Sequence, residues 1–234
     1  MTPSKSLLLV LDFEANCTNN NMRDHEIAEF PVVLIDAATG TSVAEFRSFV
    51  KPIKIKKISA FIHGLTGITD EDLRTGAAWA EALKMFGEWC LKNNVNSQTT
   101  TVVTCGDWDL KTMFPRQLQI SGTHSISDDL HKLFDCWTNV KETYCVVKRY
   151  RRAPGMEGML GDLGLQLVGR HHSGIDDCRN IARICQALIM RYGQDLTLPN
   201  RLREVPYHFG GQQWYKRLPG GRIVPNVENK VVFM

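Results

Sequence analysis

The first feature of the chain is a run of five aliphatic residues, 7–11 (LLLVL), that is followed at once by two acidic side chains. A short aliphatic run of this kind is typical of a strand buried on both faces. Asp12 and Glu14 are two positions apart, so in extended backbone their side chains point to the same face. Two interpretations follow: the strand ends at Leu11 and both acids are solvated, or the acids hold a cation that offsets their repulsion.

The pattern after this run alternates between strand-like and helix-like segments as far as about residue 191. Apolar and β-branched runs predict three further strands, over residues 26–36, 43–50 and 101–105. Helical spacing and start signals predict six helical segments: from residue 70, over 78–92, from about 109, over 126–150, from 156 to about 164, and after 177 to about 191. The third is expected to be disturbed at Pro115, and the fourth to break at 137–138. Residues 59–69 are predicted to be an apolar loop.

The order of these elements predicts an α/β fold. Three antiparallel strands come first, and helices then enclose a further strand, which favours a mixed sheet flanked by helices. From Leu196 the composition changes, because prolines, paired glycines and aromatic residues replace the helical pattern. We therefore predict one domain over residues 1–195 and a C-terminal extension over 196–234 that packs against the domain or binds a protein partner.

Composition narrows the class of protein. The chain has 234 residues, 43% of them hydrophobic, which is enough for one sizeable folded domain. A net charge of +3 permits a nucleic-acid partner without requiring one. Seven cysteines without C-x-x-C spacing favour neither a disulfide framework nor a zinc site and fit a reducing compartment. With no apolar run of membrane-spanning length, we expect a soluble intracellular protein of the cytoplasm or nucleus, without a membrane partner.

Acidic residues recur beside predicted core elements at three places. Asp12 and Glu14 are the first, Asp109 follows the strand over 101–105, and the pair at 176–177 stands five residues after a histidine pair. Several carboxylates and one histidine suit two-metal hydrolysis of a phosphodiester, in which the histidine accepts a proton from water. Oxygen ligands select Mg²⁺ or Mn²⁺.

The spacing alone leaves two choices of register open. His171 stands five residues before Asp176, and His172 stands five before Asp177, so either pair fits. In the same way Asp107 competes with Asp109, since both follow the strand closely.

The sequence resembles the DEDDh 3′-to-5′ exonucleases of the ribonuclease-H-like fold over residues 7–192. The matching motifs are Asp12-Phe13-Glu14, Trp108-Asp109, and the segment 172–177 (HSGIDD). It is most similar to the ERI-type RNA exonucleases, which include the histone-mRNA 3′ exonuclease, through the segments 26–34 (EIAEFPVVL), 65–69 (LTGIT), 106–110 (GDWDL) and 174–184 (GIDDCRNIARI). The resemblance implies a mixed five-stranded sheet flanked by helices.

The resemblance also implies a role for each acidic motif. Four carboxylates would hold two Mg²⁺ ions, for which Mn²⁺ can substitute: Asp12 bridging both, Glu14 and Asp177 on the nucleophile side, and Asp109 on the other. His172 would be the general base, because the family pattern selects His172 with Asp177. Asp176 is then expected to cap the helix.

Four further residues would contact the terminal nucleotide. The resemblance implies that Phe13 and Ala15 lie against it, and that Leu65 and Trp108 stack on its base. Ordinary core packing is the alternative for Leu65 and Trp108. For Glu29, a structural role in the sheet competes with a catalytic one.

These matches predict a metal-dependent 3′-to-5′ exoribonuclease. It would trim single-stranded RNA 3′ ends, including the 3′ overhangs of structured RNA, and release nucleoside 5′-monophosphates. Three alternatives stay open: an exonuclease of the same fold that prefers DNA, a catalytically silent RNA-binding or scaffold protein, and an interaction protein that acts through residues 196–234.

Overall fold

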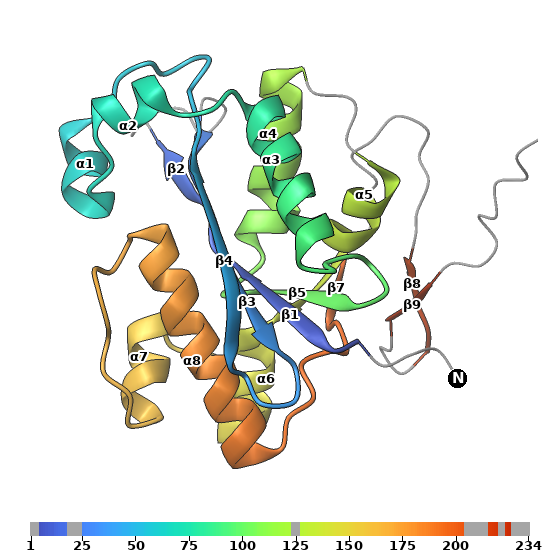
Figure 1. The fold of residues 1–234 in the computed structure, drawn as a ribbon. Helices are drawn as coiled ribbons and strands as arrows, with labels where there is room; N and C mark the ends of the chain where they lie inside the picture. Colours follow the sequence, from blue (N-terminus) through green and yellow to red (C-terminus); the bar gives the residue numbers. More distant parts are fainter. Residues whose placement is uncertain (1–4, 18–24, 123–126, 204–214, 220–222, 226–234) are drawn as a thin grey trace, which may run out of the picture.

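A mixed seven-stranded sheet forms the centre of the molecule in the computed structural model, which describes residues 5–17, 25–122, 127–203, 215–219 and 223–225 (Figure 1). Its strands are β1 (Leu7–Leu11), β2 (Glu14–Asn16), β3 (Glu26–Asp36), β4 (Ser42–Phe49), β5 (Thr100–Thr104), β6 (Cys136–Asn139) and β7 (Arg201–Leu202). The order is β2-β3-β1-β5-β6-β7, and β4 pairs with β3. The fold is therefore α/β with a mixed sheet, as predicted.

The first strands form the predicted antiparallel meander. β1 pairs antiparallel with β3, in a register that places Leu9 opposite Leu34, and β3 pairs antiparallel with β4. On its other side β1 runs parallel to β5, which in turn runs parallel to β6. Because β1 and β5 are parallel, the acids that follow each strand leave the sheet at the same edge.

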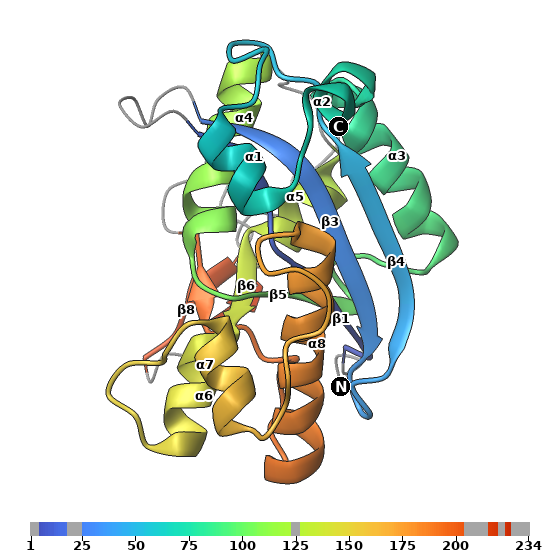
Figure 2. The same ribbon diagram turned by 90° about the vertical axis from the view of Figure 1, so that its left-hand side faces the viewer.

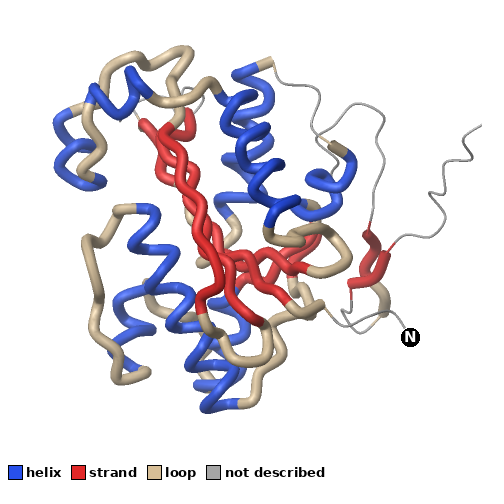
Figure 3. Tube along the Cα trace, viewed as in Figure 1, coloured by secondary structure: helices blue, strands red, loops and turns tan. Residues whose placement is uncertain are grey.

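Helices cover both faces of the sheet (Figures 1 and 3). They are α1 (Ala60–Thr66), α2 (Asp70–Thr75), α3 (Trp79–Lys92), α4 (Phe114–Ser121), α5 (Asp128–Phe134), α6 (Val140–Lys148), α7 (Met156–Asp162) and α8 (Gly174–Tyr192). Leu9 and Leu11 of β1 pack with α3, α4 and α5, whereas Leu8 and Val10 pack with α6, α7 and α8. Figure 2 shows α8 lying along the β3–β4 pair. The aliphatic run is thus buried on both faces, as its composition predicted.

Two predicted segments differ from the structure. The apolar loop predicted over 59–69 contains helix α1, which Ser59 begins by accepting a hydrogen bond from the Ile62 N–H, and which Gly67 ends at φ 77°. The predicted break in the helical region at 137–138 is strand β6. The resemblance implies five strands, and the short strands β2 and β7 bring the sheet to seven. Segments of seven and four residues are too short for periodicity to identify.

The helix predicted near Asp109 begins with one π turn, η2 (Asp109–Met113), before α4 continues. The N–H of Phe114 donates to the carbonyl of Asp109, five residues earlier. Pro115 has no N–H and cannot donate to the preceding turn, which explains the predicted disturbance at this position.

The C-terminal segment contributes short strands. β7 pairs antiparallel with β6, while β8 (Tyr215–Arg217) and β9 (Ile223–Pro225) form a separate pair. Ile223 packs against Cys136 of β6 and Leu202 of β7. Residues 204–214, 220–222 and 226–234 of the predicted extension lie outside the described residues. Among the helices of the described segments, none is long and apolar enough to cross a membrane.

Candidate active site

Acidic side chains from three elements meet where the chain leaves β1. Asp12 follows β1 and Glu14 is the first residue of β2. Helix α8 begins at Gly174, so Asp177 lies in its first turn. One carboxylate oxygen from each of these three residues lies within 4.8 Å of the other two. Asp12 and Glu14 are half-buried, so the interpretation in which both acids are freely solvated is wrong.

Asp109 is fixed beside this group from the other side of β1. Its side chain is buried, and its Oδ1 accepts a hydrogen bond of 2.8 Å from the N–H of Phe13, the residue between Asp12 and Glu14. Its negative charge helps to raise the pKa of Asp12. The four carboxylates therefore form one electrostatic group, which we call the acid cluster: Asp12, Glu14, Asp109 and Asp177.

The competing acid Asp107 has structural partners. Its Oδ1 accepts hydrogen bonds from Trp137 Nε1 at 3.2 Å, Asn139 Nδ2 at 3.0 Å and Arg201 Nε at 3.1 Å. These bonds tie the loop after β5 to β6 and β7, and they supply Asp107 with structural partners. The structure therefore places Asp109, not Asp107, among the other acids.

Asp176 likewise has partners outside the acid cluster. Its carboxylate accepts hydrogen bonds from the N–H of Arg170 at 3.1 Å and from the Arg179 guanidinium at 2.9 Å. The expectation that Asp176 caps α8 is wrong in detail, because the capping position is Ser173 and Asp176 lies inside the first turn. Asp176 fixes the preceding loop instead.

Both histidines lie beside the acid cluster. His172 has a φ of 66°, and its N–H donates to Asp177 Oδ2 at 2.8 Å. The rings of His171 and His172 are stacked with their centroids 3.9 Å apart. Each histidine offers a ring nitrogen that lies within 4.8 Å of an oxygen of Asp177. Proximity to Asp177 therefore does not by itself distinguish the two.

Glu29 holds the first turn of α8 in place. It is fully buried, and its two oxygens accept hydrogen bonds from the N–H groups of Gly174 at 3.3 Å and Ile175 at 3.2 Å. Arg47 donates to the same carboxylate at 2.8 Å. An acid at a helix N-terminus satisfies free N–H groups and complements the helix dipole. These contacts give Glu29 a structural role that positions Asp177.

Gly174 allows α8 to approach the end of β1. A Cβ atom at this position would lie 2.8 Å from Pro31 Cγ and 3.1 Å from the carbonyl oxygen of Asp12. A larger residue would push α8 away from the strand, and Asp177 would move away from Asp12 with it. The close helix–strand contact therefore helps to set the spacing of the carboxylates.

The residues predicted to contact a nucleotide lie in different environments. Phe13 is 4% exposed, with its ring against Phe30 at 5.1 Å, and Ala15 is also buried. Trp108 is 38% exposed and Leu65 is half-buried on α1. Core packing therefore does not explain Trp108, whereas Phe13 and Ala15 offer mainly backbone to any bound molecule.

A cavity of about 520 Å³ opens over three of the four acids, and Asp109 is not among its lining residues. Asp12, Glu14, Asp177 and both histidines line it, together with Lys141 and Glu157, which sequence analysis did not select. Lys141 lies in the first turn of α6 and Glu157 in the first turn of α7. No motif marks either residue, because only the packing of α6 and α7 beside α8 brings them to the cavity.

Arg170 is a second contact that sequence analysis missed. Its guanidinium reaches from the loop before α8 to the end of α1, where it donates to the carbonyls of Gly64 at 2.5 Å and Leu65 at 3.4 Å. A cation at a helix C-terminus is stabilised by the free carbonyls there. Arg170 thus joins the loop that carries His172 to the helix that carries Leu65.

The acid cluster is electrostatically strained. Burial raises the pKa of Asp12 well above its ordinary value, and repulsion from Asp109, Glu14 and Asp177 raises it further. Burial and neighbouring acids raise the pKa of Glu14 to about 9. Burial is also the main reason that the pKa values of Asp109 and Asp177 rise to about 6, while Lys141 opposes the shift for Asp109.

These residues fit a divalent cation. Asp177 Oδ1 is buried and accepts no hydrogen bond from any residue that the structure describes. Carboxylate oxygens are the ligands that Mg²⁺ and Mn²⁺ prefer, and a cation would relieve the repulsion that raises the pKa values.

We expect Mg²⁺ or Mn²⁺ to stabilise the protein more at pH 8 than at pH 5. Without metal, these carboxylates bind protons more tightly in the folded state than in the unfolded state, so their contribution to folding stability falls as pH rises. For Asp109 and Asp177 this fall extends from about pH 4 to about pH 6, and for Glu14 it continues to about pH 9. A metal ion replaces those protons, and at 100 times its dissociation constant it raises the unfolding temperature by about 5–10 °C. Thermal unfolding with metal or EDTA at both pH values measures the difference. Equal shifts at pH 5 and pH 8 would contradict the assignment.

Comparison with known proteins gives consistent matches. Residues 9–185 match the family model described as RNase_T, Exonuclease. ERI1 exoribonuclease 3 of Homo sapiens is 36% identical over 185 residues, which is 78% of this chain and 53% of that protein. The chain thus spans about half the length of this curated relative.

Two solved structures are similar over most of the chain. The nuclease domain of 3′hExo, a DEDDh family member bound to rAMP, has a TM-score of 0.74 and 29% identity, and the match covers 85% of this chain and 98% of that one. A 3′-exonuclease structure that concerns 3′-end recognition of the histone mRNA stem-loop has a TM-score of 0.73 and 25% identity, with coverage of 96% and 92%.

Proposed function

The chain belongs to the DEDDh family of 3′-to-5′ exonucleases, and from this premise we propose that it is a metal-dependent exoribonuclease that shortens single-stranded RNA from its 3′ end and releases nucleoside 5′-monophosphates. The observation that carries the proposal is the convergence of Asp12, Glu14 and Asp177, with an oxygen of Asp177 left without a hydrogen-bond donor among the described residues. The high pKa values of the acid cluster support it, because such repulsion is relieved by cations.

Family members use divalent metal ions, and the acid cluster is the donor set for them here. Asp12, Glu14, Asp109 and Asp177 would hold two Mg²⁺ ions, for which Mn²⁺ can substitute. When bound, such ions stabilise the charge on the attacking and leaving oxygens of the phosphodiester. Glu29 and Gly174 keep α8 close to β1, so that Asp177 faces Asp12.

His172 is the proposed general base. Its backbone is fixed by the N–H bond to Asp177, and its ring lines the cavity together with the acids. Burial lowers its pKa, as does the neighbouring His171, which keeps the imidazole neutral and able to accept a proton from water at neutral pH. The neighbouring His171 has a different partner, since its Nδ1 lies 3.4 Å from Glu157 Oε2.

Trp108 and Leu65 are the proposed contacts to the terminal base. Trp108 exposes enough of its ring for stacking, and Leu65 is held by the Arg170 contact at the end of α1. Stacking on a base tolerates any sequence, which suits an enzyme that removes successive nucleotides. Preference for RNA is inferred from relatives that are named exoribonucleases.

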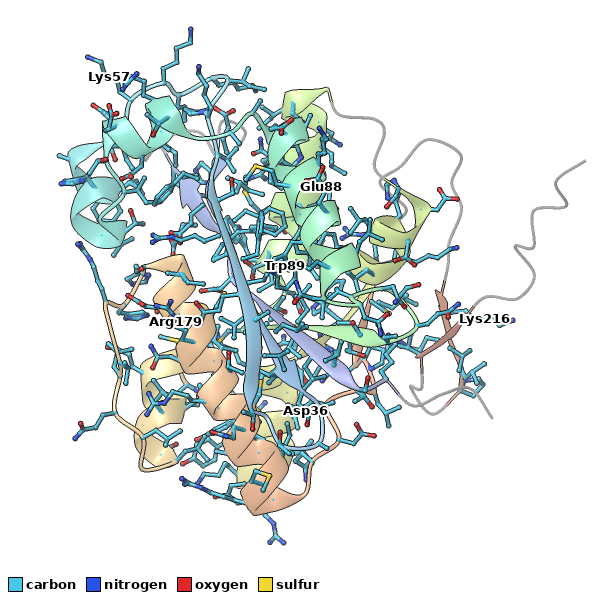
Figure 4. All side chains as sticks on the ribbon, in the orientation of Figure 1. Asp36, Lys57, Glu88, Trp89, Arg179 and Lys216 are labelled. Carbon is cyan, nitrogen blue, oxygen red and sulfur yellow. The ribbon has the colours of Figure 1, made fainter. Side chains whose placement is uncertain are left out.

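A fixed basic loop offers further contacts to the nucleic-acid backbone. Four exposed lysines lie between residues 51 and 57, and Figure 4 shows Lys57 projecting from this loop. The buried carboxylate of Glu26 accepts hydrogen bonds from the N–H groups of Ile53, Lys54 and Ile55 at 2.8, 2.7 and 2.9 Å. Because the loop backbone is ordered before binding, its lysines can contact phosphates with a smaller loss of entropy.

The test is a time course with 5′-labelled single-stranded RNA and its DNA counterpart in Mg²⁺, Mn²⁺ or EDTA. We expect a ladder that shortens from the 3′ end, with 5′-monophosphates as products and no shortening in EDTA. Faster shortening of the DNA would replace the RNA preference by a DNA preference. Intact RNA in both metals, with RNA binding retained, would favour the catalytically silent RNA-binding protein.

A further inference from the structure

A second group of possible metal ligands lies next to the acid cluster and differs from it in chemistry. His171, His172 and Asp177 each offer an atom within 4.8 Å of the others. Glu157 extends this group, since its Oε2 lies 3.4 Å from His171 Nδ1. The acid cluster offers oxygen alone, whereas this group offers two imidazole nitrogens and two carboxylates. We call it the histidine cluster.

Two nitrogens and two oxygens form a typical set of ligands for Zn²⁺. Zinc takes four ligands in a tetrahedron, with histidine nitrogens and carboxylate oxygens at about 2.0–2.2 Å, so neighbouring ligand atoms lie roughly 3.4 Å apart. Mg²⁺ instead prefers oxygen in an octahedron, and binds histidine poorly. The histidine cluster therefore selects a different ion from the one proposed for catalysis.

The side chains of the histidine cluster can close around an ion. Glu157 is 58% exposed and His171 is 32% exposed, so both can turn without disturbing the core. The two imidazole rings are now stacked with an angle of 12° between their planes, and one ring must turn for both lone pairs to meet a single ion. The ligand atoms of His171, His172 and Asp177 lie within 4.8 Å of one another, so each separation need shrink by at most about 1.4 Å to reach tetrahedral spacing.

We propose that His171, His172, Asp177 and Glu157 form a Zn²⁺ site that inhibits the enzyme. The inference rests on the proposed function for its effect on activity, but not for the binding of zinc. Zinc held there engages the lone pair that His172 uses to accept a proton. It also engages Asp177, which belongs to both clusters. Zinc in the histidine cluster and catalysis by the acid cluster are therefore mutually exclusive.

Direct metal binding tests the site without RNA. The full chain is titrated with Zn²⁺ against a fluorescent chelator, and with Co²⁺, whose visible absorption reports four-coordinate ligation. We expect His171→Gln and Glu157→Gln each to weaken Zn²⁺ binding, His171→Gln by at least about tenfold. His63→Gln, which removes an exposed histidine on α1, is the matched control and should bind as the wild type does.

Asp12→Asn separates the two clusters, because it removes a ligand of the acid cluster alone. Zinc binding that survives Asp12→Asn and is weakened by His171→Gln supports the histidine cluster. Zinc binding that is lost in Asp12→Asn but unchanged in His171→Gln places the ion in the acid cluster and overturns the proposal. Zinc binding that is unchanged in both variants, or absent from the wild type, overturns it as well. In RNA shortening with excess Mg²⁺, zinc should inhibit the wild type at least about tenfold more strongly than His171→Gln. A protein without nuclease activity that still shows this binding pattern would refute the proposed function and leave the zinc site standing.

Discussion

Replacing Asp12 by asparagine should abolish RNA shortening and make the metal-free protein harder to unfold. Asp12 interacts electrostatically with every other member of the acid cluster, since burial raises its pKa and repulsion from Asp109, Glu14 and Asp177 raises it further. Asparagine keeps the shape but removes the charge that would bridge two metal ions. We expect activity in Mg²⁺ to fall by at least about 10³-fold, or ~4 kcal/mol of transition-state stabilisation.

The same substitution should raise the unfolding temperature of the metal-free protein at pH 8. Asparagine removes a buried acid whose ionisation is made costly by burial and by the neighbouring carboxylates. A gain of ~1 kcal/mol corresponds to about 2–4 °C at this chain length. Thermal unfolding in EDTA measures the shift. Addition of Mg²⁺ should then stabilise the wild type more than the variant.

Asp107→Asn is the matched control, because Asp107 is close in sequence to Asp109 but bonded to Trp137, Asn139 and Arg201. It should lower the unfolding temperature through loss of the charged bond to Arg201, while activity stays within about tenfold of the wild type. If Asp107→Asn were inactive and Asp12→Asn active, the assignment of the acid cluster would be wrong.

Sequence patterns predicted the centre of this fold because its strongest signals are local. The aliphatic run at 7–11 is buried on both faces, and the stripe of α3, which includes Trp79 and Phe86, packs against the sheet as its spacing indicates. Strand β6 and helix α1 were missed for a physical reason. Each is shorter than about two helical turns and is held by tertiary contacts or caps, so its local pattern does not differ from that of a loop.

In the candidate site, too, the residues marked by local sequence patterns were predicted, and those brought in by tertiary packing were not. Acids beside predicted core strands indicated one two-metal site that includes Asp12, Glu14 and Asp109, and the structure brings these three residues together. Lys141 and Glu157 could not be predicted, because helices far apart in the sequence bring them to the cavity. Arg170 could not be predicted either, because its partners on α1 lie about a hundred residues earlier in the chain. Their contacts depend on packing and leave no spacing motif. The roles assigned to individual site residues stay predictions until the variants are measured.

Replacing His172 by glutamine should lower RNA shortening by about 10²–10⁴-fold, the usual contribution of a general base. His171→Gln should retain activity within about tenfold, because the family pattern assigns the general base to His172, while His171 Nδ1 lies 3.4 Å from Glu157 Oε2. The two variants decide between the registers that the spacing leaves open. Activity lost in His171→Gln and retained in His172→Gln would show that the base is His171.

The pH dependence of the two variants gives an independent readout. A general base works only when it is unprotonated, and burial together with His171 lowers the pKa of His172 below its ordinary value of 6.5. Activity of the wild type in saturating Mg²⁺ should therefore rise with pH along a limb that lies on the acidic side of 6.5. In His171→Gln the imidazole of His172 loses a neighbour that lowers its pKa, so the limb should move toward higher pH. In His172→Gln the residual activity should no longer rise with pH along this acidic limb, because the imidazole that accepts the proton is gone. If the pH profile of His172→Gln keeps the limb at the same position and slope, another group accepts the proton.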